Sequence, residues 1–217
     1  MLNQFQNVIF DLDGTLVNSS EEVLICFKRA FDKANYPVDE ARLTSDIIGP
    51  PLRQILETIA PELTDEDKIS EIIANFRQIY DYDENDISVM YDGILDVLKQ
   101  LKKSNKKIFI ATFKPQIPAM RVVEMFGIKE MFDDIYTIDK FGKHITKDEM
   151  ISNIVETYGL NKADTVMVGD AASDVTAAKK AGVTALGVLW GYGSDKSKLI
   201  ENSDLLVESS KELICQK

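Results

Sequence analysis

Residues 8–16 read Val-Ile-Phe-Asp-Leu-Asp-Gly-Thr-Leu, and this stretch decides the fold and locates the chemistry of the chain. The apolar residues 8–10 predict the end of a buried strand. Asp11 and Asp13 follow at once, and Gly14 predicts a turn. Two carboxylates at the end of a buried strand are costly unless a cation or a reaction requires them. The stretch therefore predicts a strand that ends in a chemical site.

Apolar strand signals recur along the chain and alternate with helical patterns. The strand signals lie at 7–10, 107–111, 134–138, 164–168, 184–189 and 204–207. Helical patterns lie at 92–104, 116–126, 147–158, 172–181 and 195–201. This alternation predicts an α/β fold, a Rossmann-like parallel sheet with helices on both faces.

The exception is the segment 19–84, which carries helical patterns and no strand signal. The patterns lie at 20–35, 40–48, 51–60 and 65–83, and Ser19 with Glu22 fits a capping box at the first of them. Because the segment is too long for a simple crossover, we expect an inserted α-helical cap between linkers at 14–18 and 85–91. The predicted domains are a core of residues 1–16 and 88–217 and a helical cap of residues 17–87.

Composition limits the partners of the chain. It has 217 residues, of which 45% are hydrophobic, and a formal net charge of −11. Such a charge disfavours nucleic-acid binding. No stretch is apolar enough to span a bilayer, and the first residues do not resemble a signal peptide, so we expect a cytoplasmic protein with no membrane partner. Cys26 and Cys215 are expected to be free thiols.

Polar side chains gather at the predicted carboxyl ends of three strands, where parallel sheets bind ligands. Asp11 and Asp13 end the first, Thr112-Phe113-Lys114 follows 107–111, and Gly169-Asp170 with Asp174 follows 164–168. A capping box at Thr146 and Glu149 places Lys147 in the first turn of a helix. Lys143 is the rival lysine, but a glycine precedes it, so we expect it in a loop, as we do His144.

Each of these residue types has a chemical use. Asp11, Asp13 and Asp170 offer hard oxygen ligands, which suit Mg²⁺. A single histidine and two distant cysteines make a zinc site improbable. A carboxylate can attack phosphorus, and a second one can carry the proton of the leaving group. A metal and Lys147 would offset charge on the phosphoryl group, while Thr112 and the next amide would hydrogen-bond its oxygens.

The four motifs together resemble the haloacid-dehalogenase-like superfamily, and they do so in the family's order. Asp11-Leu-Asp13-Gly14-Thr15 resembles the first motif, and Thr112, Lys147 and Gly169-Asp170-xxx-Asp174 resemble the second, third and fourth. The segment 19–84 is similar to the family's helical cap. Within the superfamily, residues 48–53 (Ile-Gly-Pro-Pro-Leu-Arg) and 91–93 (Tyr-Asp-Gly) resemble the phosphoglycolate phosphatase group.

The resemblance implies a role for each matching residue. Asp11 would be the nucleophile and Asp13 the general acid and base. Asp11, the main-chain carbonyl of Asp13, and Asp170 would hold Mg²⁺, with Asp174 behind them, acting through water or by orienting Lys147. Thr112, the amide of Phe113 and Lys147 would bind phosphate, and Arg53 of the cap would reach the substrate. Phe113 departs from the family pattern, in which a small residue is commoner, and its side chain would narrow the pocket.

The expected activity is the hydrolysis of a small phosphorylated metabolite through an aspartyl phosphate, with phosphoglycolate as the substrate that the resemblance implies. A nucleoside monophosphate, a sugar phosphate and pyrophosphate remain alternatives, as do a monomer and a homodimer. Dehalogenation is disfavoured because halide needs no proton from Asp13. A phosphonate hydrolase would need a cap lysine, and 45–56 has none; a hexose-phosphate mutase would need a cap histidine, and none lies between 14 and 143.

Functions other than the hydrolysis of a phosphate ester fit the sequence less well. A calcium loop would need glycine where Leu16 stands and a helix where a strand precedes. A receiver-type signalling domain needs no helical insertion, and Asp13 is suited to hydrolysing a phospho-aspartate rather than preserving it. A catalytically inactive phosphate-binding homologue remains the alternative of a different class, although all four motifs are intact.

Overall fold

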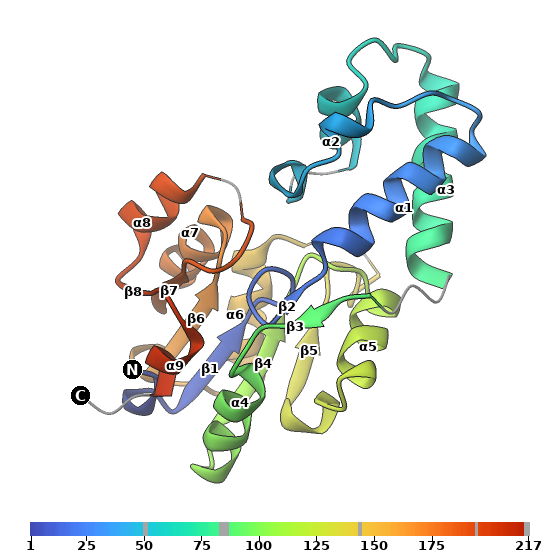
Figure 1. The fold of residues 1–217 in the computed structure, drawn as a ribbon. Coiled ribbons are helices and arrows are strands. Elements are labelled where there is room, and N and C mark those ends of the chain that lie inside the picture. The colour runs from blue at the N-terminus through green and yellow to red at the C-terminus, as the bar shows by residue number, and fades with distance from the viewer. Residues whose placement is uncertain (50–51, 83–86, 143–144, 194, 215–217) are drawn as a thin grey trace. The chain divides into compact units, whose positions relative to one another are not determined.

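Six parallel strands form the sheet of the core, in the order β5-β4-β1-β6-β7-β8 (Figure 1). The structure, a computed structural model, describes residues 1–49, 52–82, 87–142, 145–193 and 195–214. The strands are β1 (Asn7–Phe10), β4 (Lys107–Ala111), β5 (Asp134–Tyr136), β6 (Thr165–Gly169), β7 (Thr184–Val188) and β8 (Leu205–Val207). The predicted α/β class and all six predicted strands are confirmed.

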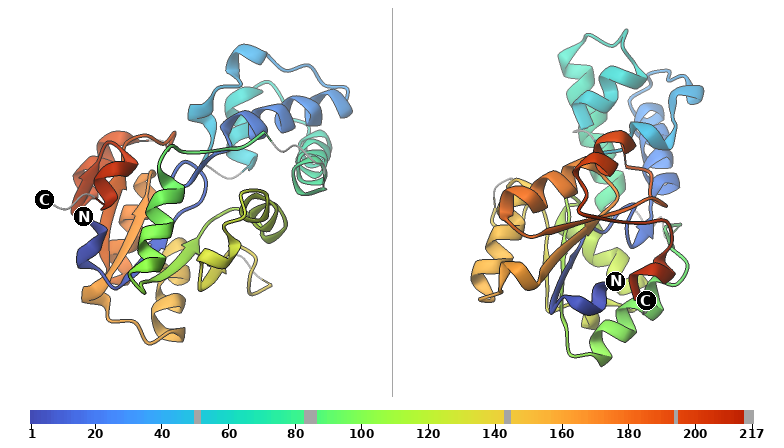
Figure 2. Two further views of the ribbon diagram at one scale, coloured as in Figure 1. Left: turned by 60° about the horizontal axis from the view of Figure 1, so that its bottom comes forward. Right: turned by 90° about the vertical axis from the view of Figure 1, so that its left-hand side faces the viewer.

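Helices cover both faces of the sheet because alternate strand residues are buried on opposite sides (Figure 2). Val8 and Phe10 pack with α4 (Ile94–Lys103), α5 (Gln116–Met125) and α9 (Ser210–Ile214). Ile9 packs with α6 (Lys147–Thr157), α7 (Ala172–Ala181) and α8 (Lys196–Asn202). Short 3₁₀ turns lie at Leu2–Gln4, Lys129–Met131 and Lys162–Asp164. All four residues of β1 are buried, which explains the apolar run of residues 8–10, and the polar Asn7 donates a hydrogen bond to Thr165 Oγ1.

Strand β1 lies between β4 and β6, and the chain runs outward from it in both directions. Phe10 is in register with Ile110 of β4 and with Val168 of β6. The carboxyl ends of these three strands therefore meet at one edge of the sheet. This is the switch point at which open parallel sheets form their ligand sites.

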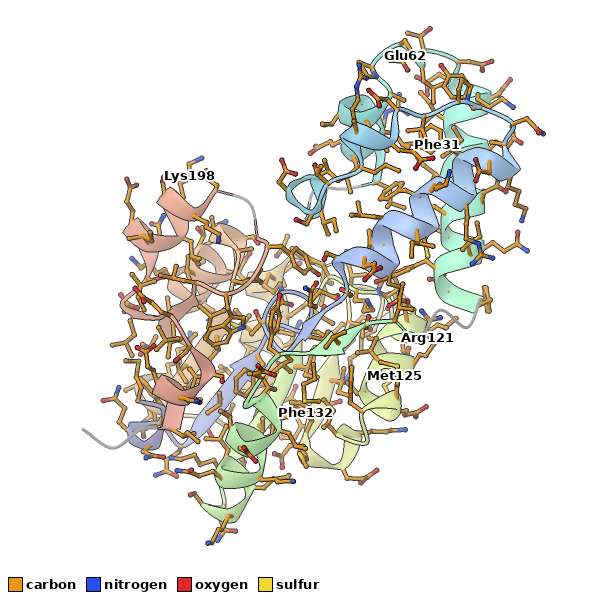
Figure 3. The ribbon with its side chains drawn as sticks, viewed as in Figure 1. Phe31, Glu62, Arg121, Met125, Phe132 and Lys198 are labelled. Carbon is orange, nitrogen blue, oxygen red and sulfur yellow. The ribbon has the colours of Figure 1, made fainter. Side chains whose placement is uncertain are left out.

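The chain divides into two compact units, one of Met1–Asn18 with Val89–Lys217 and the other of Ser19–Ser88. The second unit holds α1 (Ser20–Lys33), α2 (Leu52–Ile59) and α3 (Glu66–Tyr82), with 3₁₀ turns at Glu40–Arg42 and Ser45–Ile47. The predicted helix at 40–48 is therefore wrong, since only these two turns form there. Phe31 lies inside a separate apolar core of this unit (Figure 3), in which the rings of Phe27 and Phe76 are 4.3 Å apart.

Two short strands and one helix were not anticipated. Val17–Asn18 (β2) pairs antiparallel with Val89–Met90 (β3), so the segments predicted as linkers form a two-stranded ladder. Strands of two residues are too short to show an alternating pattern. Helix α9 spans only five residues, fewer than two helical turns. Its length hides the 3.6-residue periodicity that reveals longer helices.

The two predicted capping boxes have opposite outcomes. Thr146 and Glu149 form the expected box at the start of α6. Ser19 makes no side-chain cap hydrogen bond at α1, so that prediction is wrong. Glu22 is buried, and its carboxylate accepts a hydrogen bond of 2.5 Å from Ser88 Oγ at the other end of the helical unit. Glu22 therefore links the two ends of the helical unit instead of capping α1.

Two further expectations concern thiols and membranes. Cys26 is buried and forms no disulfide with any described residue, whereas Cys215 lies outside the described residues. Lys143 and His144, both expected in a loop, also lie outside them. None of the helices in the described part of the chain is long and apolar enough to cross a membrane.

The separate core of the helical unit predicts that its stability can be lowered selectively. Phe31→Ala removes a fully buried ring, which costs about 3–5 kcal/mol. Hydrogen exchange should then accelerate at amides of α1 and α3 and remain slow in β1 and β6. Phe109→Ala, at a fully buried ring of the sheet core, is the matched control and should reverse the pattern. Equal loss of protection in both units would contradict separate cores.

Candidate active site

Three acidic side chains meet at the carboxyl edge of the sheet. Asp11 follows β1, Asp170 follows β6, and Asp174 lies in the first turn of α7. All three are buried, and one carboxylate oxygen from each lies within 4.8 Å of the others. The predicted strand ends indicated that these acids would lie close together, and in the structure they do.

Lys147, the first residue of α6, is buried among these acids. Its Nζ donates to Asp11 Oδ1 at 2.8 Å and to the carbonyl of Ala111 at 3.1 Å, and it lies 2.9 Å from Asp174 Oδ1. Burial lowers the pKa of Lys147, but Asp11 and Asp174 raise it more, so the net shift is upward. The ammonium group therefore stays charged and holds two carboxylates in place.

Asp13 forms an ion pair with Lys114, a residue for which the sequence predicted no role in the site. Lys114 Nζ lies 3.0 Å from Asp13 Oδ1, and the lysine is buried whereas Asp13 is half-buried. The signal was present, since Lys114 follows the strand beside β1 and an acidic pair at a strand end needs a counter-ion. The amide of Lys114 also donates to Thr112 Oγ1 at 3.0 Å. This bond fixes the buried Thr112 hydroxyl at the end of β4.

Asp170 is held by a turn and a loop that contain glycines. It accepts hydrogen bonds from Thr15 Oγ1 at 3.2 Å and from the Gly193 amide at 2.7 Å. A Cβ added to Gly14, whose φ is +80°, would lie 2.1 Å from Asp170 Oδ2, and one on Gly191 would lie 2.2 Å from the same oxygen. Only glycine lets both backbones approach the carboxylate this closely.

Trp190 joins the same two segments. Its Nε1 donates to the carbonyl of Thr15 at 3.1 Å, and its ring centre lies 6.4 Å from that of Tyr91. Burial, with the nearby charges of Asp170 and Asp13, raises the pKa of Tyr91 to about 12. Tyr91 therefore remains a neutral phenol beside the acidic site.

The electrostatics of the acids call for a cation. Burial raises the pKa of Asp11 to about 8, with Lys147 opposing the rise and Asp174 and Asp170 adding to it. Burial and Asp174 raise the pKa of Asp170 to about 7, against the hydrogen bonds from Gly193 and Thr15. When all four acids are ionised, the two lysines leave two negative charges uncompensated.

The donor set fits a hard divalent cation. The clustered groups offer only carboxylate oxygens, and oxygen ligands suit Mg²⁺. Asp174 accepts from the Ala171 amide through Oδ2, and its Oδ1 lies 2.9 Å from Lys147 Nζ. The excess of two negative charges among these buried groups is what a bound divalent cation would relieve.

The two remaining predicted residues lie in different surroundings. Phe113 is 40% exposed, and Lys147 Nζ lies 4.9 Å from the centre of its ring. Arg53 belongs to α2 of the helical unit, where it donates to both carboxylate oxygens of Glu66 at 2.9 and 2.6 Å. Its contact with a substrate stays a prediction.

Comparisons with known proteins identify the family. A model of the haloacid dehalogenase-like hydrolases matches residues 8–188. Pyrophosphatase PpaX of Halalkalibacterium halodurans is 30% identical over 181 residues, 83% of this chain and 81% of that protein. A 5′-nucleotidase of Pseudomonas aeruginosa is 29% identical over 88% of this chain and 86% of its own. Tyrosine-protein kinase PtkA of Mycobacterium tuberculosis is 31% identical over 87% of this chain, which spans 63% of that kinase.

A solved structure agrees with these relatives. The crystal structure of a predicted phosphatase from Clostridium acetobutylicum has 30% identity and a TM-score of 0.81, and covers 96% of both chains. The chain therefore belongs to the haloacid dehalogenase-like hydrolases. Its phosphatase relatives and structural neighbours support a phosphoric monoester hydrolase within that family. The resemblance drawn from the four motifs is confirmed.

The raised pKa values predict how stability depends on pH in the absence of divalent cations. An unfolded aspartate has a pKa of about 3.9, whereas the folded values are about 8 for Asp11 and about 7 for Asp170. These two groups therefore contribute fully to the free energy of unfolding below about pH 4, and this contribution is lost as the pH rises to about 8. Each kcal/mol lost lowers Tm by about 2–4 °C.

Thermal unfolding in EDTA between about pH 5 and pH 8, in steps of half a unit, measures this effect. Asp170→Asn removes one of the two groups and should flatten the slope relative to the unaltered protein, because amides do not titrate. Mg²⁺ should raise Tm more at the upper end of the range than at the lower. Identical slopes in both proteins would contradict the assignment.

Proposed function

We propose that the protein is a Mg²⁺-dependent phosphatase that hydrolyses a small phosphate monoester through an aspartyl phosphate at Asp11. The observation that carries the proposal is the buried Lys147, which binds the Asp11 carboxylate and lies against Asp174. A carboxylate held by one ammonium group beside an acidic cluster is suited to attack phosphorus once a cation offsets the clustered charge.

The metal site would use the carboxylates of Asp11 and Asp170 and the main-chain carbonyl of Asp13, with Asp174 orienting Lys147 from behind. The fit is supported by the oxygen-only cluster and by its two uncompensated negative charges. Bound Mg²⁺ would lower the pKa of Asp11 and offset charge on the phosphoryl oxygens.

In the first step, a carboxylate oxygen of Asp11 forms a bond to phosphorus while the bond from phosphorus to the leaving oxygen breaks. Asp13 donates its proton to that oxygen, so the leaving group departs as a neutral alcohol. Lys147, the Thr112 hydroxyl and the amide of Phe113 would bind the phosphoryl oxygens. Once the proton has been transferred, Lys114, whose Nζ lies 3.0 Å from Asp13 Oδ1, would stabilise the Asp13 carboxylate.

In the second step, water attacks the phosphorus of the aspartyl phosphate, and Asp13 takes the proton of that water. The bond between phosphorus and the Asp11 oxygen breaks, which releases inorganic phosphate and restores both carboxyl groups to their starting states. The helical unit would set the substrate, with Arg53 as its expected ligand, and the enzyme would act in the cytoplasm as a monomer or homodimer.

The substrate class is open among small phosphorylated metabolites. Phosphoglycolate follows from the resemblance of residues 48–53 and 91–93, while pyrophosphate and nucleoside monophosphates follow from the names of relatives. A sugar phosphate is a further candidate. A phosphate-binding or signalling protein without turnover is the alternative of a different class, and steady Mg²⁺-dependent turnover of a chromogenic ester would exclude it.

Removing the nucleophile should abolish turnover without unfolding the protein. Asp11→Asn is expected to lower kcat at least about 10³-fold, because an amide does not attack phosphorus at a useful rate. Turnover of 4-nitrophenyl phosphate with Mg²⁺ measures the loss, and circular dichroism checks the fold. Asp96→Asn, at an exposed acid of α4, is the matched control and should keep full activity. Substantial turnover by Asp11→Asn would overturn the mechanism.

Removing the proton carrier should trap the intermediate. Asp13→Asn is expected to slow hydrolysis of the aspartyl phosphate, so ³²P from a labelled ester accumulates on the protein and is lost in neutral hydroxylamine. Label that resists both hydroxylamine and alkali would be phosphotyrosine, and this would favour a kinase activity like that of PtkA over the proposal.

A further inference from the structure

We propose that the physiological ester has an uncharged leaving group with an apolar or planar face, such as a nucleoside or an aryl alcohol. A leaving group that carries a carboxylate or a second phosphate would be disfavoured. This inference rests on the proposed function and narrows its substrate class. Two features of the core carry it, the aromatic ring at Phe113 and the pairing of both site lysines, and the acidic composition of the helical unit agrees with it.

Phe113 places an apolar surface next to the phosphoryl site. The residue directly follows Thr112, and its ring lies 4.9 Å from the ammonium group that binds Asp11. With 40% of its surface exposed, the ring is available to a ligand. It offers no hydrogen-bond donor, and its face is electron-rich, so an anionic group beside it would lose hydration without gaining a partner. A planar or apolar group would instead pack against it.

Both lysines of the site already lie against carboxylates, which limits the positive charge available to an anion other than the phosphoryl group. Lys147 lies against Asp11 and Asp174, and Lys114 lies against Asp13. Both ammonium groups are buried, so neither can swing away to another ligand without leaving a carboxylate uncompensated. All candidate esters share the phosphoryl group, which would itself occupy the positive charge of the two lysines and the bound cation. Little positive charge would then be left for a second anion.

The helical unit has a large excess of acidic residues. Residues 19–88 contain 16 acidic and 7 basic residues, a formal charge of −9 out of −11 for the chain. Four of its basic side chains each lie within 3.9 Å of a carboxylate, namely Lys28, Arg42, Arg53 and Lys68.

Arg53 shows the consequence of this pairing. Its guanidinium group binds Glu66 through two hydrogen bonds and lies 3.5 Å from Glu57. Turning to an anionic leaving group would leave two carboxylates without their cation. An uncharged leaving group would not compete with these two carboxylates for the charge of Arg53.

Pairs of esters that differ only in charge test the inference. We would compare kcat/KM with Mg²⁺ for phenyl phosphate against 4-carboxyphenyl phosphate, and for the amide of phosphoglycolate against phosphoglycolate itself. The neutral member of each pair is expected to be at least about tenfold better, and pyrophosphate is expected to be a poor substrate. Raising NaCl from about 0.05 to 0.5 M should narrow the difference because salt screens interactions between charges.

Variants of Phe113 test whether its aromatic ring causes the preference for a neutral leaving group. Phe113→Asn should reduce the preference for the neutral member at least about threefold, whereas Phe113→Leu, which stays apolar, should retain it. Ile200→Asn, at an exposed apolar residue of α8, is the control and should leave the preference unchanged. Equal or better turnover of the charged members would overturn the inference while leaving the phosphatase standing. Absence of turnover with every ester would instead overturn the proposed function.

Discussion

The buried ion pair between Lys147 and Asp11 is the interaction on which the site depends. It links the first turn of α6 to the end of β1, 136 residues apart in sequence, and Asp174 of α7 lies against the same ammonium group. Breaking such a pair leaves a buried charge without compensation, which is far more costly than losing an exposed pair. The capping box of Thr146 and Glu149 fixes the start of α6 and therefore the position of the lysine.

The parts predicted well from sequence share one physical origin. Strands buried on both faces have unbroken apolar sequences, and their carboxyl ends then locate Asp11, Thr112 and Asp170 without further information. The parts predicted poorly depend on contacts between distant residues. Glu22 looked like a capping acid because Ser19 stood three residues before it, yet it pairs with Ser88. Lys114 went unassigned because its partner Asp13 lies 101 residues away.

The charges of the two units differ in kind. In the core, buried acids and lysines are arranged so that a deficit of two positive charges remains at one edge of the sheet. In the helical unit the acids are mostly exposed and outnumber the bases by nine. The first arrangement would favour the binding of a cation and a phosphoryl group, as the proposed function requires. The second gives that unit a formal charge of −9, so the excess of acidic residues is found in two different settings.

The loop after β7 has a consequence for how this protein can be observed. Trp190 is the only tryptophan of the chain, and its indole nitrogen binds the carbonyl of Thr15, whose hydroxyl binds Asp170. Indole emission responds to hydrogen bonding and to nearby charge. The protein thus carries an intrinsic fluorophore two hydrogen bonds from its acidic cluster, with no second tryptophan to obscure it.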